Sequence, residues 1–239
     1  MPVKPHLRRR LVSEGVGTAF LLATVVGSGI MGERLAGGNV AIALLANTLA
    51  TGAVLVALIL TFGSLSSHFN PVVTLADAVI GGLSWAEVPA YLAAQVAGAF
   101  AGVAVADAMF SEPLFAASQH VRAGPAQLLS EFVATFGLIV VILGVVRTRS
   151  AAVPYAVGAY ITAAYWFTSS TSFANPAVTL ARSATNTFAG IRPVDVAPFV
   201  VVQVLGAAAA TVLLAWLMPA APEDASQTST ARPEPEGAP

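Results

Sequence analysis

Charged residues are absent from five long stretches of this sequence, and that absence limits what the chain can fold into. The stretches are Leu35 to Ala76, Val88 to Ala106, Phe132 to Val146, Ser150 to Ala181 and Val196 to Pro222. Only 10% of all residues are charged and 56% are hydrophobic, whereas soluble domains carry about 25% charged residues. A membrane span needs about 20 apolar residues. The sequence therefore predicts an all-α protein that crosses a lipid bilayer several times.

The apolar stretches divide into six expected spans. Their approximate bounds are Leu11–Met31, Asn39–Phe62, Trp85–Ala108, Gln127–Val146, Ala152–Phe167 and Val194–Met218. Two further uncharged segments, Asn70–Ile80 and Asn175–Thr185, are too short to cross a bilayer. We expect one membrane domain over residues 11–219, preceded by a short N-terminus (1–10). The tail (220–239) is rich in Pro, Glu, Ser and Thr, a composition typical of disorder.

Three motifs occur twice, in the same order, and indicate an internal repeat covering about 11–108 and 126–219. The pairs are Glu14-x-x-x-Thr18 with Glu131-x-x-x-Thr135, Asn70-Pro-Val-Val-Thr-Leu-Ala76 with Asn175-Pro-Ala-Val-Thr-Leu-Ala181, and Gln95-x-x-Gly98 with Gln203-x-x-Gly206. Each half has three spans, an odd number, so the two halves must insert with opposite orientations. Inverted repeats with interrupted helices are typical of membrane transport proteins, whose solute site lies near the midplane.

The Asn-Pro dipeptides predict two short half-helices. Proline is favoured at the first position of a helix and asparagine just before it, so Asn70 and Asn175 should cap helices that begin at Pro71 and Pro176. In an inverted repeat these helices enter from opposite faces and their N-termini meet. Two N-termini at one point create a positive spot that opposes cations, while asparagine amides can donate hydrogen bonds to a passing neutral solute.

These motifs resemble those of the aquaporin, or major intrinsic protein, family. The resemblance rests on Asn70-Pro71-Val72, Asn175-Pro176-Ala177, His68 and the two Glu-x-x-x-Thr motifs. It implies a passive channel with one pore per subunit of a homotetramer. It also implies that Glu14 and Glu131 hold the interrupted loops. We expect His68 to act as a loop brace, with a pH gate as the alternative.

The expected selectivity filter departs from the family pattern. Where the family has an arginine after the second Asn-Pro-Ala, this chain has Val178. Thr51 replaces a bulky aromatic residue, and Ser172 occupies the loop position. Tyr165 is the choice for the fifth span, with Ala163 as the ungapped alternative. We therefore expect a wide, weakly selective filter.

A wide filter with valine in place of arginine resembles a bacterial branch linked to arsenic resistance. The resemblance implies arsenite or related organoarsenicals as solutes, with glycerol and water. Arg182 follows Val178 by one helical turn; it either substitutes in part for the missing arginine or, like Asp77 at the equivalent position, makes local contacts. Tyr165 and Trp166 could also serve as interfacial anchors, and small residues at 98, 102, 206 and 210 are expected at helix contacts.

Other function classes are less consistent with the residues present. There are no cysteines and the net charge is −1, which excludes thiol chemistry and disulfides and argues against nucleic acid as a partner. No set of nucleophile, base and orienting group is apparent, and no metal or cofactor is expected. An ion-coupled transporter would have to use Glu14 and Glu131, and a water-selective channel remains an alternative.

Positive charges predict the orientation. Arg8, Arg9 and Arg10 precede the first expected span, and Arg147 and Arg149 lie between the fourth and fifth. With six spans both groups fall on one side of the membrane. Because positive residues favour the cytoplasm, we expect both termini to be cytoplasmic in an inner (plasma) membrane.

Overall fold

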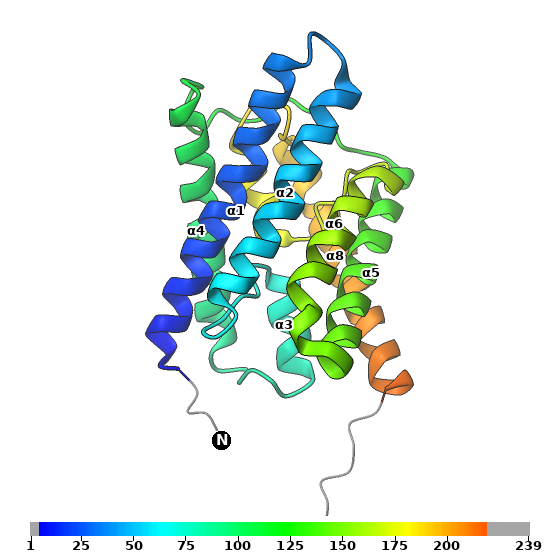
Figure 1. Cartoon of the computed structure of the whole chain (residues 1–239). Helices are drawn as coiled ribbons and strands as arrows, with labels where there is room; N and C mark the ends of the chain where they lie inside the picture. Colours follow the sequence, from blue (N-terminus) through cyan, green and yellow to red (C-terminus); the bar gives the residue numbers. More distant parts are fainter. Residues whose placement is uncertain (1–4, 219–239) are drawn as a thin grey trace, which may run out of the picture.

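The computed structural model describes residues 5–218, and all regular structure in this range is helical (Figure 1). The long helices are α1 (Leu7–Leu35), α2 (Val40–Phe62), α4 (Val88–Met109), α5 (Pro125–Arg149), α6 (Val153–Phe167) and α8 (Pro193–Leu217). Two short helices, α3 (Pro71–Val79) and α7 (Pro176–Arg182), follow the Asn-Pro motifs. The predicted disordered tail, 220–239, lies outside the described residues.

The long helices correspond to the six expected spans. Five helical segments are long and apolar enough to cross a membrane, because α5 and α6 form one continuous segment, Pro125–Phe167, through the 3₁₀ turn η1 (Ser150–Ala152). Helix α6 has only 15 residues of its own. The prediction of an all-α membrane fold with two half-helices in an inverted repeat is confirmed.

Close packing of helix pairs follows the repeat. Helix α1 packs along α4, and α5 packs along α8. A Cβ added at Gly98 would lie 2.2 Å from the Gly15 carbonyl oxygen, and one at Gly206 would lie 2.5 Å from that of Phe132. These glycines therefore let two backbones approach each other, as small residues do in membrane helix interfaces.

The two half-helices complete the interior from opposite ends. Helices α1 and α8 have their free ends at one end of the bundle, which we call the inner end; the α1–α2 turn lies at the other, the outer end (Figure 1). Helix α3 lies toward the inner end. The C-terminus of α7 lies toward the outer end, where the Ser183 carbonyl accepts a hydrogen bond from Ser118 N–H in the α4–α5 loop.

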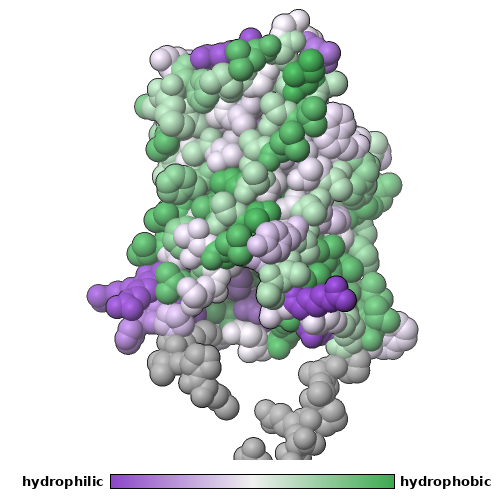
Figure 2. Space-filling model, viewed as in Figure 1, coloured by the Kyte–Doolittle hydropathy of each residue, from purple (hydrophilic) through white to green (hydrophobic). Residues whose placement is uncertain are grey.

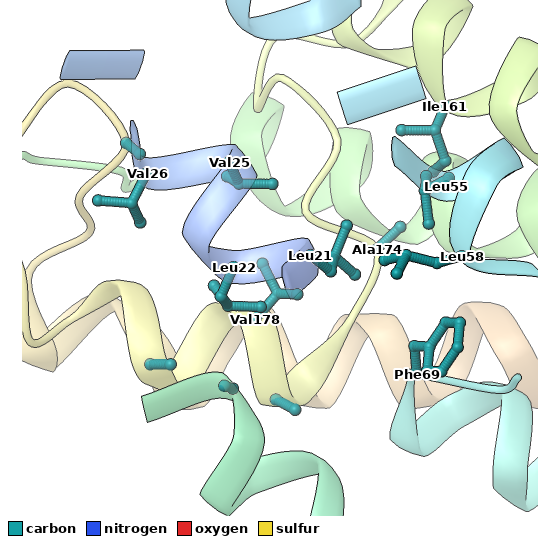
Figure 3. Close-up of a cluster of buried hydrophobic side chains, with 14 of the residues drawn as sticks. Leu21, Leu22, Val25, Val26, Leu55, Leu58, Phe69, Ile161, Ala174 and Val178 are labelled. Carbon is teal, nitrogen blue, oxygen red and sulfur yellow. The ribbon is translucent and has the colours of Figure 1, made fainter. Parts of the chain in front are cut away.

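The outer surface of the bundle is apolar along the helices. Large hydrophobic side chains are exposed there, including Phe20, Val212 and Trp216, the last with 76% of its surface accessible. Figure 2 shows hydrophobic residues along the flank and hydrophilic residues concentrated near the two ends. This distribution fits a bilayer as the surrounding solvent. The interior is also apolar, with side chains from α1, α2, α6 and α7 gathered near the centre (Figure 3).

Candidate solute pore

One cavity is lined by both halves of the repeat. Its wall combines residues of α1, α2, α5 and α6 with both half-helices and the loops that precede them, whereas α4 and α8 contribute none. Most of the wall is aliphatic, from residues such as Leu21, Leu55, Ile161 and Val178 (Figure 3). Polar groups are therefore few, and their positions decide what can pass.

The two asparagines tie the half-helices together at the centre of this cavity. The Asn70 side-chain oxygen accepts a hydrogen bond from Val72 N–H, and the Asn175 oxygen accepts bonds from Ala177 and Val178 N–H. Asn70 Nδ2 donates to the Ala174 carbonyl at 2.8 Å. Asn175 Nδ2 donates to the Phe69 carbonyl at the same distance. Because an amide NH₂ has two donors, each asparagine keeps one N–H for a solute oxygen.

Glu131 holds the loop before α7. Its Oε1 accepts a hydrogen bond from Phe173 N–H at 2.8 Å, and its Oε2 accepts bonds from Ala174 N–H at 2.9 Å and Gln203 Nε2 at 2.6 Å. The side chain is fully buried. Gln203 Nε2 also contacts Thr179 Oγ1, 2.9 Å away, so that one carboxylate links α5, α7 and α8.

Glu14 does the same for the loop before α3. It accepts hydrogen bonds from the backbone N–H groups of His68 and Phe69, from Ser66 Oγ and from Gln95 Nε2. The two glutamines are functional residues whose role the sequence analysis missed. The signal was present, since they are the third element of the repeat.

The loops need this support because their backbone is strained. Phe69 has φ +49° and Ala174 has φ +46°, a left-handed conformation that costs non-glycine residues about 1–3 kcal/mol each. This conformation points the N–H of each residue toward a buried glutamate and its carbonyl toward the asparagine of the other half.

The predicted filter residues lie around the same cavity, on the outer side of the asparagines. Thr51 Oγ1 and Tyr165 Oη are 3.2 Å apart and hydrogen-bonded. Ser172 is buried and its hydroxyl has no protein partner. Tyr165 lines the cavity, whereas Ala163 and Trp166 face outward. The wall at this level thus presents the paired hydroxyls of Thr51 and Tyr165 and the aliphatic Val178, whereas the Ser172 hydroxyl is closed off from the cavity.

Two arginines flank this level from different segments. Arg182 lines the cavity, donates through Nε to the Ala189 carbonyl and lies over the Phe173 ring, 3.4 Å from its centroid. Arg122, from the α4–α5 loop, lies 4.8 Å from the same centroid. It donates hydrogen bonds to the carbonyls of Gly190 and Ser170. Burial lowers the pKa of Arg122 to about 10, so its guanidinium is charged at neutral pH and braces the loop before α7.

His68 and Asp77 lie together at the inner mouth of the cavity. His68 Nε2 is 3.5 Å from an Asp77 carboxylate oxygen, and His68 Nδ1 is 3.1 Å from Thr74 Oγ1. Both residues line the cavity. His68 therefore makes the contacts of a loop brace and also faces the space that a solute would cross.

Comparisons with known proteins agree with this architecture. The model of the major intrinsic protein family matches residues 2–169, more than half of the chain. Aquaglyceroporin AqpS of Rhizobium meliloti (strain 1021) is 55% identical over 224 residues, 93% of this chain and 96% of that protein. Aquaporin NIP2-2 of Zea mays is 34% identical over 198 residues, 78% of this chain and 65% of that protein.

A solved structure shows the same fold. The X-ray structure of the aquaglyceroporin from Plasmodium falciparum matches with a TM-score of 0.68 at 19% identity, over 87% of this chain and 96% of that one. The chain therefore belongs to the major intrinsic protein family, as a multi-pass membrane channel for water and small neutral solutes such as glycerol, and not an enzyme.

Proposed function

We propose that this channel passes neutral, hydroxyl-rich solutes larger than water, namely arsenite as As(OH)₃, related organoarsenicals and glycerol. The observation that carries the proposal is the composition of the cavity wall on the outer side of the two asparagines. Val178, with no donor, occupies the position of the family's filter arginine, while the paired hydroxyls of Thr51 and Tyr165 lie at the same level of the cavity. Such a wall offers hydrogen bonds to several solute hydroxyls and leaves room for them.

Passive flow is supported by the state of the buried glutamates. Coupling to H⁺ or Na⁺ needs a carboxylate that the ion can reach. Glu14 and Glu131 are fully buried, accept bonds from protein donors on both oxygens and do not line the cavity. They are therefore placed to fix loops and not to bind a transported ion.

The test is solute entry into proteoliposomes that contain the full chain. Arsenite, glycerol and water permeation are followed by stopped-flow light scattering, with and without a proton gradient. We expect arsenite and glycerol to enter at rates that the gradient does not change. Rapid water flow with both solutes excluded would overturn the proposal in favour of a water-selective channel, and rates that rise with the gradient would overturn passive flow.

Val178→Arg is expected to lower arsenite and glycerol entry by about tenfold or more, with a smaller effect on water. Val178 is 5% exposed and lies on the cavity wall, so a guanidinium there would narrow the passage. Val178→Leu is the control for side-chain size without new donors. Equal solute rates in the arginine variant and the parent would show that the filter is not at this level.

We also propose a homotetramer in the plasma membrane with cytoplasmic termini. Arg8 and Arg9 are exposed at the inner end, and Arg147 and Arg149 lie in the last turn of α5. Positive residues favour the cytoplasmic side. Mass measurement of the purified protein in nanodiscs tests the tetramer, and protease access to a tag on either terminus of sealed, right-side-out vesicles tests the orientation.

A further inference from the structure

Arg182 is a buried cation without a counter-ion. It is 2% exposed, and within residues 5–218 its side chain forms no ion pair; its one hydrogen bond is that from Nε to the Ala189 carbonyl. An unpaired charge inside a protein is costly unless something solvates it. The two terminal nitrogens are not among the polar atoms that lack both solvent access and a hydrogen-bond partner. Because the residue lines the cavity, water in the pore must solvate them.

The position of this charge is fixed by the half-helix. Val178 and Arg182 are four residues apart on α7 and both face the cavity, which places Arg182 about 6 Å farther toward the outer end. The Phe173 ring beneath the guanidinium and the Ala189 carbonyl beside it hold the group in place. Arg122, whose guanidinium carbon lies 4.8 Å from the centroid of the same Phe173 ring, adds a second positive charge close by.

The equivalent residue of the first repeat carries the opposite charge. Asp77 follows Val73 on α3 as Arg182 follows Val178 on α7, and it lines the inner part of the same cavity. Its carboxylate lies 3.5 Å from His68 Nε2. The positive charge that faces the cavity from α7 is therefore at its outer end, and the acidic residue is at its inner end.

We propose that Arg182 is a specificity-determining residue that rejects cations at the outer end of the pore. It lies one helical turn beyond Val178, which carries no charge. A guanidinium stays charged at all physiological pH values, and a fixed positive charge in a pore opposes cations. Because the charge lies one turn outside the filter, the filter itself can be wide enough for neutral solutes while small cations are still excluded. The inference holds for any neutral solute and does not depend on arsenite.

The test measures methylammonium uptake at neutral pH, with glycerol entry in the same vesicles as the control for an open, folded pore. Methylammonium is smaller than glycerol, so size does not exclude it. Arg182→Gln is expected to raise its uptake at least about tenfold over the parent. Arg182→Lys, which keeps the charge, should exclude it. Arg34→Gln removes an exposed positive charge outside the cavity at the outer end and should also exclude it.

A second variant separates charge from folding. The chain has no cysteine, so Arg182→Cys introduces a single thiol. We expect 2-aminoethyl methanethiosulfonate, which adds a positive group, to restore exclusion, and the 2-sulfonatoethyl reagent, which adds a negative one, to leave methylammonium entering. Continued exclusion in a glycerol-conducting Arg182→Gln or unmodified Arg182→Cys channel, or a leak in Arg182→Lys as large as that in Arg182→Gln, would overturn the proposal.

Discussion

Glu131→Gln is expected to abolish glycerol flux and to lower the free energy of unfolding by about 2–4 kcal/mol. The carboxylate faces only donors: the N–H groups of Phe173 and Ala174 and the amide of Gln203. A glutamine side chain has one accepting oxygen and one donating nitrogen, so its NH₂ would meet a donor whichever way it turned. Purified protein would show the loss as a lower temperature of thermal aggregation.

The loss should exceed that of the hydrogen bonds alone, because the glutamate stabilises a strained loop. Ala174 adopts a left-handed conformation that its neighbours must over-determine to persist. Without the carboxylate, the Ala174 carbonyl, which accepts a hydrogen bond from Asn70 Nδ2, is free to turn away. The centre of the pore would then lose the arrangement that leaves one N–H of each asparagine open.

Two further variants serve as a negative control and as an equivalent substitution. Glu33→Gln makes the same chemical change on an exposed residue of α1 and should leave both flux and stability unaltered. Glu14→Gln should match Glu131→Gln, since Glu14 faces an equivalent set of donors. Normal glycerol flux in Glu131→Gln would show that the loop is held by its own packing.

Local and repeated signals explain why so much of the fold could be predicted. An Asn-Pro step sets a cap and a first turn within three residues, so Asn70 and Asn175 were enough to predict α3 and α7. The apolar stretches set the long helices in the same way. The bounds are less precise because polar residues such as Arg10 continue a helix past the membrane; α1 begins at Leu7 and ends at Leu35.

The contacts that could not be predicted join segments far apart in the sequence. Arg122 reaches the loop before α7, 48 residues away at Ser170, and nothing in its neighbourhood in the sequence indicates that partner. The register of Tyr165 against Ala163 depends on how α6 meets the preceding turn, which spacing alone does not fix. Arg182 left two readings open because the cavity that it faces is formed by both repeats.

Gly98→Ala is expected to lower the free energy of unfolding by about 3 kcal/mol or more and to prevent accumulation of folded channel. The new Cβ would lie 2.2 Å from the Gly15 carbonyl oxygen and 2.9 Å from its carbon. Both atoms belong to the backbone of α1, so no side chain can rotate away, and α1 and α4 would have to separate. Gly15 is next to Glu14, so this movement would also pull the carboxylate from the loop before α3.

At Gly144 in α5, substitution by alanine is expected to leave the free energy of unfolding unchanged or to raise it. No atom lies within 4 Å of an added Cβ there, and alanine is favoured over glycine inside a helix by up to about 1 kcal/mol. Gly144→Ala should thus unfold at the same temperature as the parent or a higher one, while Gly206→Ala, 2.5 Å from the Phe132 carbonyl oxygen, should behave like Gly98→Ala. Similar melting temperatures for all three would mean that the paired backbones can separate without cost, and that close packing does not hold the two halves of each repeat together.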